Sequence, residues 1–157
     1  MEKIEKLKKI FKREKIDGYI IPKNDEFFSE YIPFYNDRLN FISNFSGSYG
    51  FALILKNKNY LFVDGRYTLQ ANRQSGRLFN IVTVPDNMPC DVLKGKKLSI
   101  GFDPKLFTEK SLLIFFGKKK LTLRPIVNNL IDEIWHRKIM IKKNKFYLMP
   151  NRAVSEK

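Results

Sequence analysis

The chain has 157 residues, the length of one ordinary domain, and hydrophobic residues make up 43% of it. Aromatic residues make up 14%, which excludes a wholly disordered chain, since such chains lack the aromatic side chains that build a core. One cysteine, Cys90, excludes an intramolecular disulfide and a cysteine-based zinc cage. The apolar runs are far shorter than the ~20 residues of a membrane span, and the charged N-terminus lacks the apolar core of a secretory signal. We therefore expect a cytoplasmic protein with no membrane partner.

The charge of the chain is strongly positive. Thirty Lys and Arg residues against sixteen Asp and Glu residues give a formal net charge of +14. Such a charge suits a nucleic-acid-binding module, but an AT-rich coding bias toward Lys, Asn and Ile produces the same count. Most lysines fall at turns and ends, and no nucleic-acid motif interleaved with aromatic residues is present. Nucleic-acid binding is therefore the less favoured alternative, which a salt titration against RNA tests.

The first predicted element is an amphipathic surface helix over residues 2–15. Its apolar side chains share one helical face: Ile4, Leu7, Ile10 and Phe11. A short buried strand follows over residues 19–22 and ends at Pro22. After a loop-rich stretch over 24–35, residues 37–42 predict a short helix.

The middle of the chain predicts a hairpin followed by a helix. Apolar runs over 51–55 and 60–63 are joined by the polar residues 56–59, a pattern typical of two antiparallel strands. Asp64 can cap a helix that runs to about Gln74 and ends at Gly76. A strand over 79–84 ends at Pro85.

The last third predicts strands over 98–102 and 121–123, on either side of a helix. That helix begins at Thr108 or Ser111 and ends at Gly117. Residues 128–136 predict one more helix with an apolar side. Because strands and helices alternate around one hairpin, we expect an α/β fold with a mixed β-sheet flanked by helices. Residues 1–136 form this domain, and 137–157 read as a charged linker or tail that leads to an absent downstream domain.

Several groups that could carry chemistry have a simpler structural explanation. Residues 46–50 (SGSYG) suggest a tight turn more than a phosphate-binding loop, because no Lys-Ser or Lys-Thr follows. The adjacent carboxylates Asp25 and Glu26 suggest a solvated loop, since neighbours in sequence do not converge on one ion. Cys90, in a predicted loop, suggests an ordinary thiol, and His136 packs at a helix end or is exposed.

Residues 64–66 (DGR) are the strongest candidate for a site. They lie where an apolar strand meets a helix, a place where α/β domains commonly put functional groups. Arg66 offers a planar fork for a carboxylate or a carbonyl. The alternative, equally weighted, is that Asp64 caps the helix and pairs with Arg66.

An aromatic stretch has two open interpretations. Five rings lie in a loop-like segment without clear core periodicity: Phe27, Phe28, Tyr31, Phe34 and Tyr35. They either form an exposed interaction surface or close over the edge of the sheet.

Four segments carry a resemblance to a known family. Residues 61–71 (LFVDGRYTLQA) resemble the "TDGRYFLQA" segment of Xaa-Pro aminopeptidases (aminopeptidase P). Residues 37–50 resemble the "R..F.SGF.GS.G" stretch of that family, residues 19–32 its "YIIP…SEYI", and residues 129–135 its "NL(V/I)D.IW". The order and spacing hold over about residues 10–136, although Asn44 stands where the family commonly has Gly.

The resemblance is to the N-terminal, non-catalytic domain of the creatinase/prolidase superfamily, a mixed sheet with a ribonuclease H-like layout. It implies a substrate-gating and oligomerisation domain of a metallopeptidase that releases an N-terminal residue preceding proline. The catalytic residues and the two divalent metals, expected to be manganese, belong to a further domain that this chain lacks. The chain alone is then inactive and holds no cofactor or metal. We expect a truncated gene product, one piece of a split protein or an excised fragment. An inactive relic domain, which folds but has no function, is a further alternative.

The resemblance also assigns one binding residue. The arginine of the DGRY segment binds peptide in the family and corresponds to Arg66, which is therefore the expected substrate-binding residue. A peptide substrate would bind only together with a catalytic domain, and the protein itself is a candidate homo-oligomer.

Overall fold

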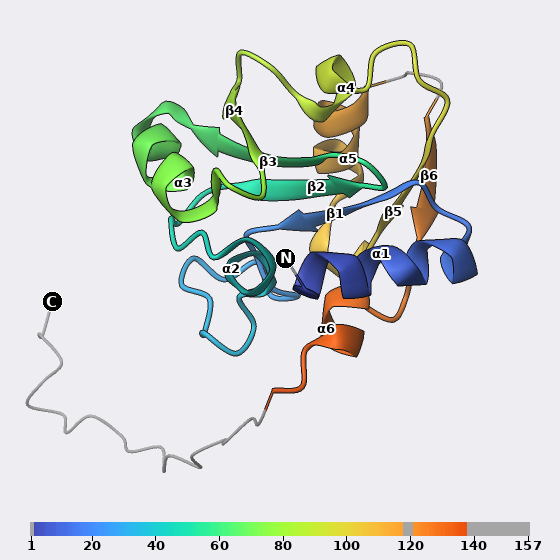
Figure 1. Cartoon of the computed structure of the whole chain (residues 1–157), viewed down its shortest axis with the longest axis horizontal. Helices are drawn as coiled ribbons and strands as arrows, with labels where there is room; N and C mark the ends of the chain where they lie inside the picture. The colour runs from blue at the N-terminus through green and yellow to red at the C-terminus, as the bar shows by residue number, and fades with distance from the viewer. Residues whose placement is uncertain (1, 118–120, 138–157) are drawn as a thin grey trace, which may run out of the picture.

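The computed structural model describes residues 2–117 and 121–137, and Figure 1 shows a β-sheet with helices on both sides. Within these described residues the helices are α1 (Glu2–Glu14), α2 (Arg38–Ser43), α3 (Thr68–Ser75), α4 (Pro89–Val92), α5 (Glu109–Phe116) and α6 (Leu130–Ile134). The strands in the same ranges are β1 (Gly18–Pro22), β2 (Phe51–Leu55), β3 (Asn59–Asp64), β4 (Asn80–Val84), β5 (Ser99–Phe102) and β6 (Thr122–Pro125). Short 3₁₀ turns η1 (Gly65–Tyr67) and η2 (Pro104–Leu106) follow β3 and β5.

The sheet is mixed, as expected from the sequence. Its strand order is β4-β3-β2-β1-β5-β6. The central strand β2 pairs antiparallel with β1 and with β3, and it is the hairpin with β3 that the sequence predicts. The outer pairs β3–β4, β1–β5 and β5–β6 are parallel. Strands β1, β3 and β5 therefore run in the same direction, and their carboxyl ends, each followed by polar residues, lie along one side of the domain.

The hydrophobic core has two parts because side chains alternate across the strands. On β2, Ala52 and Ile54 face the layer of α1, α2, α3 and α6, whereas Leu53 faces α5 and the segment around α4. Figure 1 shows α1, α2 and α6 on one side of the sheet and α4 and α5 on the other. The predicted apolar face of α1 is buried in the first layer.

The helix ends follow local chemistry. Asn44 ends α2 with a left-handed φ of 62°, a conformation that glycine and asparagine adopt most readily. Thr108 caps α5, and Gly117, with φ 61°, ends it. Gly76 ends α3 for another reason. Its φ is −60°, but a Cβ there would lie 2.5 Å from the Asn72 carbonyl oxygen.

Two expectations about elements were wrong. The helix predicted over 128–136 spans only Leu130–Ile134, because Asn129 is its N-terminal cap and Trp135 has an extended backbone. The Trp135 ring stacks on the Phe41 ring, with 4.6 Å between the ring centres. Cys90 lies in the one-turn helix α4, which begins at Pro89, and not in a loop. Apart from Arg137, the predicted tail lies outside the described residues. Within the ranges that are described, no helix is long and apolar enough to cross a membrane.

Candidate functional site

The strand-to-helix turn after β3 presents Arg66 to solvent. Its side chain is 78% exposed. Asp64 Oδ1 accepts a hydrogen bond from the Arg66 backbone N–H at 3.0 Å and so caps η1. Both predicted structural roles of Asp64, cap and ion-pair partner, are therefore present at this turn.

The side chain of Arg66 is held by one edge only. Its Nη2 donates to Asp64 Oδ2 at 2.7 Å, and its Nε lies 3.3 Å from both carboxylate oxygens. The hydrogen bond from Arg66 lowers the pKa of the Asp64 carboxyl. Because a guanidinium carries five N–H groups, its Nη1 edge stays available to a carbonyl or carboxylate from outside.

The aromatic ring below Arg66 is fixed by its neighbours. The Arg66 guanidinium lies 5.5 Å from the centre of the Tyr67 ring. The Tyr67 hydroxyl is 2.6 Å from the Ser48 hydroxyl, and the Phe45 ring meets the Tyr67 ring edge-on at 5.9 Å. Residues 46–50, expected to form a tight turn, thus help position the DGR turn.

The aromatic stretch is exposed, and the alternative that its rings close over the sheet edge is wrong. Four of its side chains are largely exposed: Phe27, Phe28, Tyr31 and Phe34. The side chain of Tyr31 reaches 86% exposure. We call Phe27, Phe28, Tyr31 and Phe34 the aromatic loop. Exposed apolar side chains gathered in one loop are typical of an interaction surface.

The base of the loop is held by hydrogen bonds to Asp25, where one expectation from the sequence was wrong. Asp25 is not solvated but only 2% exposed, and its Oδ1 accepts the backbone N–H groups of Phe27 and Ser29. Burial acts to raise the pKa of Asp25, but these N–H donors outweigh burial and the pKa is lowered. Glu26, its neighbour, is exposed as expected.

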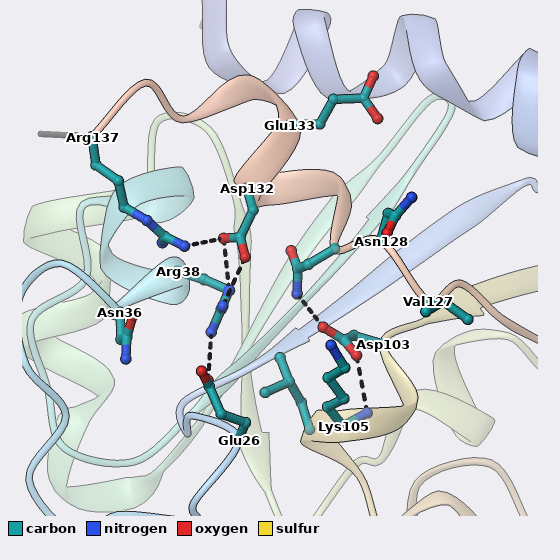
Figure 2. Close-up of a pocket in the computed structure, with 12 residues that line it drawn as sticks. Glu26, Asn36, Arg38, Asp103, Lys105, Val127, Asn128, Asp132, Glu133 and Arg137 are labelled. Carbon is teal, nitrogen blue, oxygen red and sulfur yellow. Dashed lines mark hydrogen bonds and ion pairs between the residues drawn. The ribbon is translucent and has the colours of Figure 1, made fainter. Parts of the chain in front are cut away.

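A second arginine–aspartate pair lies in a surface hollow that the sequence did not indicate (Figure 2). Arg38 on α2 donates from Nε and Nη2 to both oxygens of Asp132 on α6, each at 2.8 Å. Arg137 adds a third contact, 3.0 Å from Asp132 Oδ1. The Arg38 side chain is only 6% exposed. The hollow, about 580 Å³ in volume, lies between α2, α6, η2 and the start of the aromatic loop.

The other candidate groups, His136 and Cys90, lie outside both the Arg66 turn and the hollow beside Arg38. His136 follows the end of α6 and is exposed, and Cys90 is half-buried in α4. Within residues 2–117 and 121–137, no group of three or more His, Cys, Asp or Glu side chains could hold a metal ion. The described residues therefore do not fit a dinuclear metal centre, and no catalytic step through a metal follows from them.

Comparison with known proteins identifies the family. Residues 3–114 match the family described as the creatinase/prolidase N-terminal domain. The chain belongs to this family. It is 36% identical over 139 residues to a probable Xaa-Pro aminopeptidase P of Coprinopsis cinerea, covering 82% of this chain and 22% of the relative. A relative of the same description from Tuber melanosporum is 38% identical over 144 residues, with 85% and 23% covered.

Solved structures agree with this assignment. An X-prolyl aminopeptidase of Caenorhabditis elegans, described as a cytosolic enzyme with a di-nuclear active site, superposes with a TM-score of 0.80 at 31% identity. The match covers 89% of this chain and 26% of that one. The N-terminal domain of the cytoplasmic peptidase PepQ from Mycobacterium tuberculosis shares the fold, with a TM-score of 0.67 at 20% identity and 85% and 98% covered. The chain thus spans about a quarter of the length of its full-length relatives.

Proposed function

We propose that this chain is the substrate-gating and oligomerisation domain of an Xaa-Pro aminopeptidase-like metallopeptidase. The exposed fork of Arg66 carries the proposal. A guanidinium held at one edge by Asp64 and open at the other suits a peptide carbonyl or carboxylate better than a mobile point charge does. The full-length relatives, described as Xaa-Pro aminopeptidases, support the choice of substrate.

The proposal divides the work between this domain and a further domain. Residues of this chain bind and orient the peptide, and the further domain supplies the two divalent metals, which we expect to be manganese, and activates water. Arg66 then touches the substrate, whereas Asp64 and Tyr67 only position Arg66. A cytoplasmic location goes with this proposal, supported by the C. elegans relative described as cytosolic.

The kinetic test joins this domain to the catalytic part of a full-length Xaa-Pro aminopeptidase. We expect R66A to lower kcat/KM for an Xaa-Pro-Xaa peptide by roughly tenfold or more, because a hydrogen bond to a charged group is lost. The metal content of the enzyme stays unchanged. R73A, which removes an exposed arginine of α3, is the matched control and leaves kcat/KM as it was. Equal kcat/KM for R66A and the unmodified enzyme contradicts the proposal.

The chain by itself gives a second test. Purified protein supplied with manganese hydrolyses no Xaa-Pro-Xaa peptide, and dialysed protein retains no stoichiometric metal, because the described residues offer no cluster of ligands. Turnover above the blank, or tightly held metal, would overturn the assignment of catalysis to another domain.

The oligomerisation part of the proposal rests on the aromatic loop. We expect the chain to self-associate in sedimentation experiments as its concentration rises, since the exposed rings lose contact with water in the assembly. A double variant, Tyr31→Ser with Phe34→Ser, should remain monomeric, whereas L69S, which removes an exposed apolar side chain of α3, should behave as the parent. A parent chain that is strictly monomeric at every concentration argues against this part.

A further inference from the structure

The hollow beside Arg38 is a polar pocket with an unsatisfied donor at its wall. Arg38 Nη1 is buried and makes no hydrogen bond, although its Nε and Nη2 are both taken by Asp132. A buried N–H without an acceptor costs free energy, more so on a charged group. Arg38 therefore has one strong donor that the described residues do not satisfy.

The group that faces this donor is Glu26. Its Oε2 lies 3.6 Å from Arg38 Nη1, close enough for an ion pair but too far for a hydrogen bond. Figure 2 shows the two side chains pointing toward one another across one side of the hollow. Glu26 is 38% exposed, whereas Arg38 is 6% exposed. The glutamate can swing into solvent, but the arginine, fixed by Asp132, cannot follow it.

The loop backbone below Glu26 does not have to move for this swing. Asp25 anchors the chain there through the N–H groups of Phe27 and Ser29. Rotation of the Glu26 side chain therefore moves its carboxylate away from Nη1 without a change in the loop backbone. An incoming carboxylate would gain the hydrogen bond that Glu26 does not make.

The other charges of the pocket select the ligand. The walls carry carboxylates as well as bases. Besides Glu26 and Arg38, the charged lining residues are Asp103, Asp132, Glu133, Lys105 and Arg137. A phosphate dianion would face these carboxylates, and a metal cation would face three cationic side chains. A ligand with one carboxylate and one ammonium group matches both signs, and about 580 Å³ lies within the range of small-molecule sites.

We propose that this pocket binds a small amino carboxylate, a free amino acid or the C-terminal end of a short peptide, whose carboxylate displaces Glu26 from Arg38. The site is separate from Arg66 and does not depend on the function proposed above. Glu26 acts as an internal competitor that occupies the position of the ligand carboxylate.

Calorimetric titration of the chain with glycylglycine tests the proposal. Glycylglycinamide, which lacks the carboxylate, is the paired probe, and glycine distinguishes a free amino acid from a peptide end. We expect E26Q to tighten glycylglycine binding roughly fivefold, the effect of removing one competing partly exposed ion pair. E30Q, which removes an exposed carboxylate of the same loop outside the pocket, leaves the affinity unchanged. Glycylglycinamide should not bind.

Two results overturn the proposal. One is equal binding of glycylglycine and glycylglycinamide, and the other is an E26Q variant that binds glycylglycine no more tightly than the parent or not at all. R38K provides a further check if its unfolding curve stays cooperative, because lysine cannot keep the Asp132 fork and present a further donor. Retention of the parent affinity by R38K would also count against the proposal.

Discussion

Two arginine–aspartate pairs of this domain use the same groups for opposite purposes. Arg38 and Asp132 lie 94 positions apart in sequence and join α2 to α6, with the arginine almost fully buried. Arg66 and Asp64 lie two positions apart, and the arginine side chain is 78% exposed. The first pair holds two distant segments together, and the second holds one side chain in a useful orientation. Burial, and not the identity of the pair, separates the two roles.

The energetics follow from solvent access. An exposed ion pair contributes little because water competes for both charges. A buried arginine, in contrast, cannot lose its partner without leaving an uncompensated charge in a poor solvent. Asp132 is therefore a structural residue, while Arg66 can be removed without harm to the fold.

The largest effect should come from breaking the buried pair. D132A leaves Arg38 and Arg137 without their shared carboxylate, and we expect a loss of about 3 kcal/mol in the free energy of unfolding. Urea denaturation followed by circular dichroism measures it. E133A, which removes the exposed neighbouring carboxylate that binds Arg13, is the control and should cost well under 1 kcal/mol. Similar losses for the two variants would show that the Arg38 pair is not structural.

Asp25 should give the next largest effect and a dependence on pH. D25N weakens the turn that Phe27 and Ser29 close, at a cost of about 1–2 kcal/mol near neutral pH. Because the pKa of Asp25 is lower in the folded protein than the ~3.9 of an unfolded chain, this stabilisation is present above about pH 4. It is lost as the pH falls through the folded-state pKa.

The difference in unfolding free energy between the parent and D25N should therefore shrink below pH 4. Asp17, whose pKa is lowered by hydrogen bonds from Lys56 and from the Ser99 N–H, keeps part of the acid sensitivity in both proteins. Urea titrations at several pH values measure the difference. A gap between the two proteins that is constant with pH would show that the Asp25 carboxylate does not act through its charge.

Sequence patterns predicted the sheet and most helices because apolar spacing and capping residues are local. Ile4 and Leu7 mark the buried face of α1, and the polar residues 56–59 mark the hairpin. The contact of Arg38 with Asp132 was missed since nothing in a single sequence pairs positions 94 apart. The burial of Asp25 was missed as well, and the only signal for it was the residue type, because an Asp carboxylate commonly accepts the N–H two residues later in an Asx turn.

The cap of η1 should give a smaller effect than the buried sites. D64A removes the acceptor of the Arg66 N–H and one edge of the guanidinium clamp. We expect a fall of about 3 °C in the melting temperature, typical of a lost helix cap in a domain of this size. D64N, whose amide oxygen can still accept from the backbone, should recover most of it. An unchanged melting temperature for D64A would show that the Asp64 cap does not stabilise the domain.

The most direct test of the division between the two arginines is thermal unfolding of R66A beside D64A. We expect R66A to melt within about 1 °C of the parent chain, because the Arg66 side chain is exposed on the surface, and D64A to melt at a lower temperature. A melting temperature for R66A below that of D64A would make Arg66 a structural partner of Asp64 and would contradict its assignment to peptide binding.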